Sequence, residues 1–107
     1  MGGGPSNMQG MLRQAQKMQE RISELQEELD NRVYEIQAGG GAVSVTITGK
    51  KEIKQLSIQP DIVDPEDIET LCDVLTAAFN EAIRKVEETN TSEMEKVTGG
   101  MSIPGLV

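Results

Sequence analysis

Residues 38–58, AGGGAVSVTITGKKEIKQLSI, decide the fold of this 107-residue chain. Within this stretch, residues 42–48 alternate strictly between apolar side chains and small hydroxyl side chains, which is typical of a strand with one solvated face. The glycine run at 39–41 precedes this strand and Gly49-Lys50 follows it. Both segments favour tight turns, because glycine adopts positive φ without a steric penalty. The stretch therefore predicts a central strand with a hairpin on either side.

The two neighbouring strands are weaker in pattern but consistent with this centre. Residues 32–38 change to a period of two with β-branched and aromatic content, as expected of a strand. Residues 53–59 give a third strand in which Leu56 and Ile58 face inward. Pro60 ends this strand, because proline has no backbone N–H to donate to a neighbouring strand. We expect the three strands to form an antiparallel meander over residues 32–59.

A long amphipathic helix is predicted upstream, over residues 7–31. Ser6 and Gln9 have the spacing of a capping box, which places the helix start near Asn7 and leaves residues 1–6 as a disordered leader. Apolar residues then recur at spacings that alternate between three and four, as in a heptad seam. This seam consists of Met8, Met11, Ala15, Met18, Ile22, Leu25 and Leu29.

A second helix is predicted downstream, over residues 64–88. Asp64 is the expected N-cap and Pro65 the first helical residue, since proline is tolerated where no intrahelical bond is lost. An apolar stripe of period 3.6 follows, with the width of a helix that lies on a sheet, and Cys72 belongs to this stripe as a small buried side chain. Residues 89–107 contain Gly-Gly and Pro-Gly and little periodicity, which predicts a mobile tail. The whole chain is then one α+β domain, residues 1–107.

The first helix is too long for the sheet that it accompanies. A helix of about 24 residues is about 36 Å long at 1.5 Å per residue, whereas three short strands form a sheet of roughly 20–24 by 10 Å. Part of the seam must overhang, and an exposed apolar surface is an interaction surface by default. Self-association about a two-fold axis is the commonest way to bury it. We therefore expect a homodimer that uses seam residues Met8, Met11, Ala15, Met18 and Ile22.

The composition excludes most catalytic and metal-binding schemes. The chain has no histidine and one cysteine, Cys72, so disulfide frameworks, structural zinc sites and histidine-based nucleophilic catalysis lack their parts. Only Tyr34 and Phe79 are aromatic, so the chain has few side chains that could stack on nucleic-acid bases. The glycine run precedes a strand and not a helix, so it does not have the geometry of a dinucleotide fingerprint. We expect no enzymatic activity, no metal, no cofactor and no small-molecule substrate.

The charges are unevenly distributed. The chain carries 10 basic and 18 acidic residues, a formal net charge of −8, yet residues 1–60 hold seven of each. Within the first helix, Arg13, Lys17 and Arg21 follow one another at intervals of four, on the face roughly opposite the seam. Such a row is either an ordinary solvated face or a phosphate-binding surface, and a two-fold dimer would double it to six cations. The spacing alone leaves both interpretations open.

Four segments of the chain resemble the YbaB/EbfC family of nucleoid-associated proteins. They are LRQAQKMQERISELQEEL in the first helix, AGGGAVSVTITGKKEIKQLSI across the hairpins, DPEDIETLCDVLTAAFNEAIRKVEE in the second helix, and MEKVTGGMSIPGL in the tail. The resemblance covers essentially the whole chain in order. Two positions depart from the family pattern, since Ser44 stands where many relatives carry lysine and Thr48 where asparagine is frequent.

The resemblance implies a cytoplasmic, nucleoid-associated homodimer in which paired helices project from a joined β-sheet body and bind duplex DNA. The positions that would carry the contacts are Arg13, Lys17 and Arg21, with a second tier of Lys50, Lys51, Lys54, Arg84 and Lys85. The N-terminal residues lack the pattern of a signal peptide, and no membrane partner is expected. The alternative is a dimeric protein-interaction adaptor that uses the methionine-rich seam or the tail SIPGLV.

Overall fold

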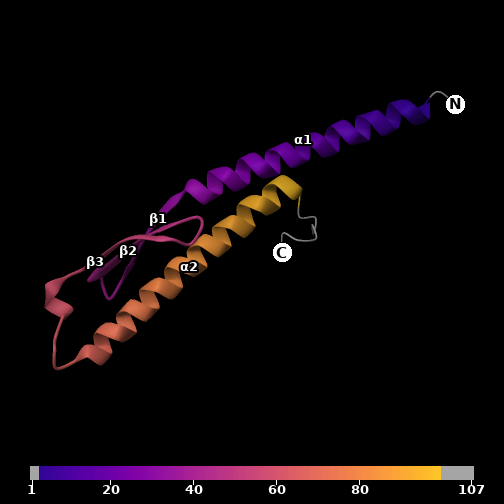
Figure 1. Ribbon diagram of the computed structural model, residues 1–107. Coiled ribbons are helices and arrows are strands. Elements are labelled where there is room, and N and C mark those ends of the chain that lie inside the picture. Colours follow the sequence, from indigo (N-terminus) through magenta and orange to yellow (C-terminus); the bar gives the residue numbers. More distant parts are fainter. Residues whose placement is uncertain (1–2, 100–107) are drawn as a thin grey trace.

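A computed structural model describes residues 3–99 of the chain, with side chains from residue 8 onward (Figure 1). The elements follow in the order α1 (Gly3–Asn31), β1 (Val33–Ala38), β2 (Val43–Thr48), β3 (Ile53–Ile58), a short 3-10 helix (Pro60–Ile62) and α2 (Ile68–Thr98). This order confirms the predicted α+β class, with two long helices and a three-stranded sheet.

The sheet is the predicted antiparallel meander, in the order β1-β2-β3. On β2, Val43, Val45 and Ile47 are fully buried, while the alternate hydroxyl side chains are half-buried on the opposite face. The glycines at 39–41 have φ angles of 62°, 69° and 93°, so the first turn needs glycine for the reason that the sequence indicated. The strand that decides the fold therefore also forms the centre of the core.

Helix α2 covers one face of this sheet. Its buried residues Ala78, Ala82 and Val86 join the β2 side chains in the core cluster, and the two alanines let the helix approach the strands closely. The helix contacts β1 and β2. On β3, Ile53 and Leu56 belong to the same face by register, yet they remain 44% and 41% exposed. The core face is thus incompletely covered along one edge.

Helix α1 begins earlier than predicted, at Gly3 instead of Asn7. Residues 3–6 of the expected disordered leader are therefore helical, and the capping-box interpretation of Ser6 was wrong. Pro5 falls in the first turn, where the missing N–H costs no intrahelical hydrogen bond. Residues 1–2 of that leader lie outside the described residues.

Helix α2 also differs from its predicted bounds at both ends. It begins at Ile68 with Asp67 as N-cap, whose carboxylate accepts a hydrogen bond from the Thr70 N–H at 3.3 Å. Asp64 accepts instead from the Glu66 N–H at 2.9 Å and closes the turn before the helix, so its assignment as N-cap was wrong.

At the other end, α2 continues to Thr98 and stops at Gly99, which has φ of 65°. Residues 89–98 are therefore helical and not part of a mobile tail. Thr98 is buried and Met94 and Val97 are half-buried, in the part of α2 that lies beside α1 (Figure 1). Packing against α1 explains helix formation in a segment with weak local signals. The rest of the predicted tail, residues 100–107, lies outside the described residues.

The molecule is strongly elongated, with principal extents of 81 × 20 × 18 Å. Its radius of gyration of 21.1 Å contrasts with about 13 Å for a compact domain of this length. Figure 1 shows the cause, because the N-terminal part of α1 continues well past the end of α2. The predicted overhang of the first helix is confirmed.

Candidate nucleic-acid interface

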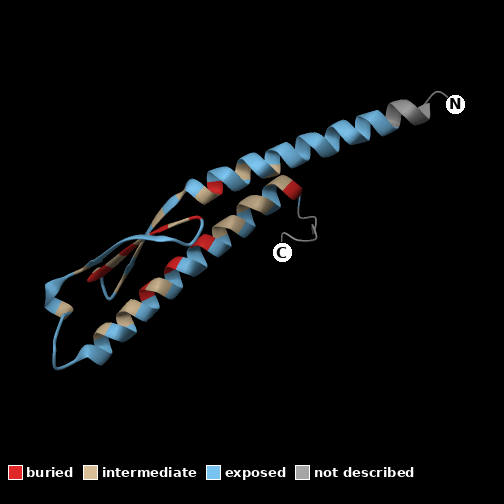
Figure 2. Cartoon of the chain, viewed as in Figure 1, coloured by how far each residue is buried: buried red, intermediate tan, exposed pale blue. Residues whose placement is uncertain are grey.

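The overhanging part of α1 has no tertiary contacts that bury it. Every side chain from Met8 to Arg21 is exposed, and burial starts only at Ile22, Leu25 and Leu29 (Figure 2). We call residues Met8–Arg21 the α1 arm. The arm is rich in glutamine, methionine, arginine and lysine, whose unbranched side chains lose little rotamer freedom in a helix. Apart from Gly10, its residues therefore favour the helix by intrinsic propensity.

One face of the arm carries a row of three cations. Each step of four residues advances the helix by about 40° beyond a full turn, so Arg13, Lys17 and Arg21 share a sector of about 80°. Within residues 8–99, no carboxylate oxygen lies within 4.0 Å of the charged nitrogens of these three side chains. Their charges are therefore directed at solvent and not at partners within the fold.

The arm also differs in charge from the rest of the chain. It holds three basic residues and one acidic residue, Glu20, whereas the remaining residues include seven basic and seventeen acidic ones. An anionic polymer would meet a locally positive surface on the arm and repulsion elsewhere. The arm thus sums to +2 and the remaining residues to −10, a contrast that the net charge of −8 conceals.

The opposite face of the arm carries the apolar seam. Met8 and Met11 are 66% and 69% exposed, and Met18 and Ala15 are also exposed, whereas Ile22 is half-buried where the arm ends. Leu12 is equally exposed and was missed in the sequence analysis, although its position four residues after Met8 and three before Ala15 marks it. The described fold leaves this seam without a partner.

The second-tier basic residues do not join the arm. Lys50 and Lys51 lie in the β2–β3 hairpin, where the ammonium of Lys51 pairs with Glu87 of α2 at 3.0 Å. Lys54 lies on β3, and Arg84 and Lys85 lie on the body part of α2. Arg84 forms an ion pair with Glu81 one turn earlier. The only row of unpaired cations that the structure assembles in residues 8–99 is therefore the one on the arm.

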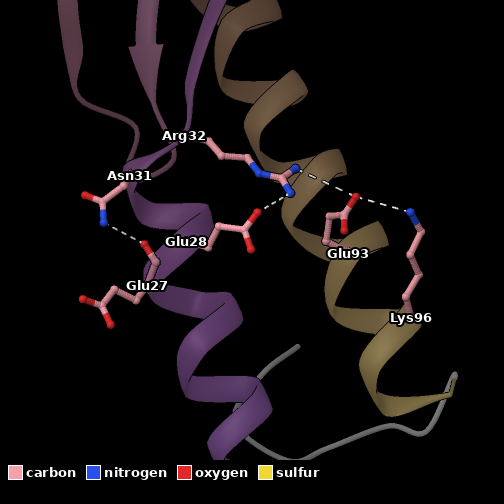
Figure 3. Close-up of polar contacts among 6 residues, drawn as sticks. All are labelled: Glu27, Glu28, Asn31, Arg32, Glu93 and Lys96. Carbon is pink, nitrogen blue, oxygen red and sulfur yellow. Dashed lines mark hydrogen bonds and ion pairs between the residues drawn. The ribbon is translucent and has the colours of Figure 1, made fainter.

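Arg32, directly after the last residue of α1, links the two helices within the body. Its guanidinium donates to the Glu28 carboxylate at 2.8 Å and lies 3.9 Å from a Glu93 oxygen of α2, which also pairs with Lys96 at 3.3 Å (Figure 3). The hydrogen bond to Glu28 raises the pKa of Arg32 above its ordinary value, with the charges of Glu28 and Glu93 adding to the effect. The contacts of Arg32 could not be predicted from the sequence, because nothing in the local sequence indicates that α2 reaches this residue.

The outer face of the sheet is polar but not basic. A shallow hollow there is lined by Glu35, Ser44, Thr46, Gln55 and Ser57, and the Ser44 hydroxyl donates to the Glu35 carboxylate at 3.2 Å. A hollow with one carboxylate and no cation does not attract phosphate. Ser44 therefore supplies no cation to this face.

Other kinds of site find no support in the described part of the chain. Within it, no three histidine, cysteine or carboxylate side chains are grouped closely enough to hold a metal ion. Cys72, expected on the buried stripe of the second helix, is instead exposed. Neither helix over residues 3–99 combines the length and the hydropathy needed to cross a membrane.

The chain is similar in sequence and in fold to known proteins. The sequence profile of the YbaB/EbfC DNA-binding family matches residues 3–101. A nucleoid-associated protein of Clostridium acetobutylicum is 49% identical over 106 residues, which cover 99% of this chain and 93% of that protein. One from Alkaliphilus oremlandii is 53% identical over 105 residues, with 98% and 92% covered. The crystal structure of an uncharacterized protein from Helicobacter pylori superimposes with a TM-score of 0.68 at 28% identity, over 87% of this chain and 95% of that one.

Proposed function

The chain belongs to the YbaB/EbfC family of nucleoid-associated DNA-binding proteins, and from this premise we propose that it binds duplex DNA as a homodimer, mainly through phosphate contacts. The contacts are made by Arg13, Lys17 and Arg21 on the α1 arm, with Lys50, Lys51, Lys54, Arg84 and Lys85 in a secondary role. The protein acts by binding and not by catalysis, and its place in the cell is the nucleoid, where it organises the chromosome or modulates expression.

The observation that carries this proposal is the row of unpaired cations on an arm that extends from an acidic body. A cation already held by a carboxylate must lose that partner to bind a phosphate, whereas Arg13, Lys17 and Arg21 bind at no such cost. Lys51 and Arg84 do have partners, Glu87 and Glu81, and this is why we rank them second. Phosphate contacts position a protein on DNA without reading its sequence.

The homodimer is supported by two uncovered apolar surfaces. The first is the arm seam, with Met8, Met11, Ala15, Met18 and Ile22, and the second is the β3 strip of Ile53 and Leu56. Isologous burial of either surface removes apolar area from water in both copies at once. Light scattering on Met11→Lys and Leu56→Lys variants tells which surface is used. A wild-type mass equal to one chain at micromolar concentration would contradict the dimer.

The binding proposal is tested by fluorescence anisotropy of a labelled random-sequence duplex at several salt concentrations. Six phosphate contacts per dimer predict a slope of log K against log salt of about −5, which weakens binding about a thousandfold between 50 and 200 mM. Reversing the row with Arg13→Glu, Lys17→Glu and Arg21→Glu should abolish binding even at low salt. The matched control changes the net charge by the same six units at exposed positions of α2 that are not proposed to contact DNA, and it leaves the arm intact. It combines Lys96→Glu with Ala77→Glu, Asn80→Glu, Thr91→Glu and Ser92→Glu.

The control should lose much less affinity than the arm variant. Equal losses in both would mean that net charge, and not the arm, determines binding. Absence of binding by the wild type at low salt would favour the adaptor function, for which the exposed seam residues Met8, Met11 and Leu12 are the specific support. In that case the affinity for the partner protein should depend little on salt.

A further inference from the structure

The end of α1 meets the β2–β3 hairpin at a backbone contact that tolerates only glycine. A Cβ added at Gly49, in the β2–β3 hairpin, would lie 1.7 Å from the carbonyl oxygen of Leu29 and 2.6 Å from its carbonyl carbon. Gly49 does not have positive φ, so the reason for glycine here is close approach and not backbone conformation. Leu29 is the last buried residue of α1 and is fully buried.

Hydrogen bonds hold this contact from three elements. The Gly49 N–H donates to the Arg32 carbonyl at 2.9 Å, and the Arg32 N–H donates to the Leu29 carbonyl at 3.2 Å. The Asn90 side-chain amide of α2 donates to the Gly49 carbonyl at 3.4 Å. The end of α1, the hairpin and α2 therefore meet at Gly49, and the Arg32 side chain adds its ion pairs to Glu28 and Glu93 beside them (Figure 3).

We propose that this joint, centred on Gly49 and completed by Arg32 and Asn90, is a positioning device that sets the direction of the α1 arm and thereby the affinity for DNA. The inference rests on the proposed function. The joint acts at a distance, because Arg13 is sixteen residues, or about 24 Å along the helix, from Leu29. A tilt of about 15° at the joint moves Arg13 by roughly 6 Å, twice the length of a hydrogen bond of about 3 Å.

The arm is the part that must move when the joint is disturbed. Thr48, next to Gly49, pairs with Val33 on one side and bonds to Glu52 and Lys51 in the hairpin on the other. Residues 22–31 of α1 also pack beside α2, but side chains on α1 are exposed up to Arg21, so nothing in the described fold restrains the arm itself. An added methyl group at Gly49 is therefore expected to displace the last turn of α1 and to leave the sheet in place.

The test compares Gly49→Ala with Gly10→Ala in the full chain. An added Cβ at Gly10 meets nothing within 4 Å, so this control adds the same methyl group without a contact. Spin labels on Cys72, which is exposed, and on Gln16→Cys report the distance between the body and the arm, with labelled chains diluted in unlabelled ones. The salt slope of duplex binding is measured on the same variants.

We expect Gly49→Ala to shift or broaden the distance distribution. We also expect it to make the salt slope shallower, from about −5 to about −3, because the displaced arms contact fewer phosphates at the same time. A mere loss of folded protein would leave the slope unchanged. Because alanine favours the helix more than glycine does, Gly10→Ala should neither broaden the distance distribution nor reduce the salt slope. If Gly49→Ala does not fold, Arg32→Gln is measured in its place. We expect this variant to broaden the distance distribution and to reduce the magnitude of the salt slope by about one.

Two results would overturn the inference. One is an unchanged distance distribution in the variant that folds, and the other is a changed distribution with an unchanged slope. Either can be told apart from failure of the proposed function, which would appear as full affinity in the Arg13, Lys17 and Arg21 reversal variant. In that case the arm would not be the DNA-binding element, whatever its direction.

Discussion

The two long helices are nearly equal in length, 29 residues for α1 and 31 for α2, but their surroundings are opposite. Helix α2 buries small residues against the sheet over its middle and packs beside α1 at its end. The α1 arm buries nothing and relies on residues that favour the helix by themselves. The difference teaches that stability and binding are separated here, with the fold held by the body and the charge presented by the arm.

The largest expected effect on stability tests this difference directly, by truncating an aliphatic side chain in each of the two regions. Ile47→Ala should lower the free energy of unfolding by about 2–4 kcal/mol, because a fully buried side chain leaves a cavity between β2 and α2. Leu12→Ala on the arm should change it by less than about 0.5 kcal/mol, since Leu12 is exposed. Urea denaturation measures both, and equal losses would show that the arm is part of the folded core.

A smaller effect is expected from enlarging a buried residue of α2. Ala82→Leu should cost about 1–3 kcal/mol, because the helix lies close to the sheet and has no room for extra carbons at this position. Ala77→Leu is the control, since Ala77 belongs to the same helix and is exposed. A thermal unfolding temperature that falls in neither variant would mean that α2 is loosely packed.

The smallest effect concerns the start of α2. Asp67→Ala should cost about 1 kcal/mol, because it removes the hydrogen bond to the Thr70 N–H at the helix N-terminus. Asp64→Ala removes only a bond within the preceding turn and should cost less. The order of the two urea midpoints checks the observed N-cap against the one that the sequence suggested.

Much of the body was predictable because its signals are local. The alternation along β2 identified the faces of the sheet, and the glycines at 39–41 identified the first turn. The start of α2 was misplaced because Asp64 and Asp67 are equally good caps by residue type, and Pro65 favoured the earlier one. Local preference could not decide between two aspartates three residues apart.

The contacts that place the arm could not be predicted, because they are made between distant segments. Residues 89–98 are helical where they pack beside α1, and their own sequence gives little periodicity. Gly49 was recognised only as a turn residue, although its more demanding role is to lie against the carbonyl of Leu29. The row of Arg13, Lys17 and Arg21 was visible in the sequence, but the absence of ion pairs to it within residues 8–99 was not.

The most direct test of this separation is an NMR titration of the isotope-labelled full chain with a short duplex, in which every backbone amide reports on its own surroundings. If the arm is the DNA-binding element, amide signals of Met8–Arg21 shift or broaden first, while those of buried β2 residues such as Val45 stay in place. Signals that change on the outer sheet face or on the acidic surface of α2, with the arm unaffected, would contradict the proposed role of the arm.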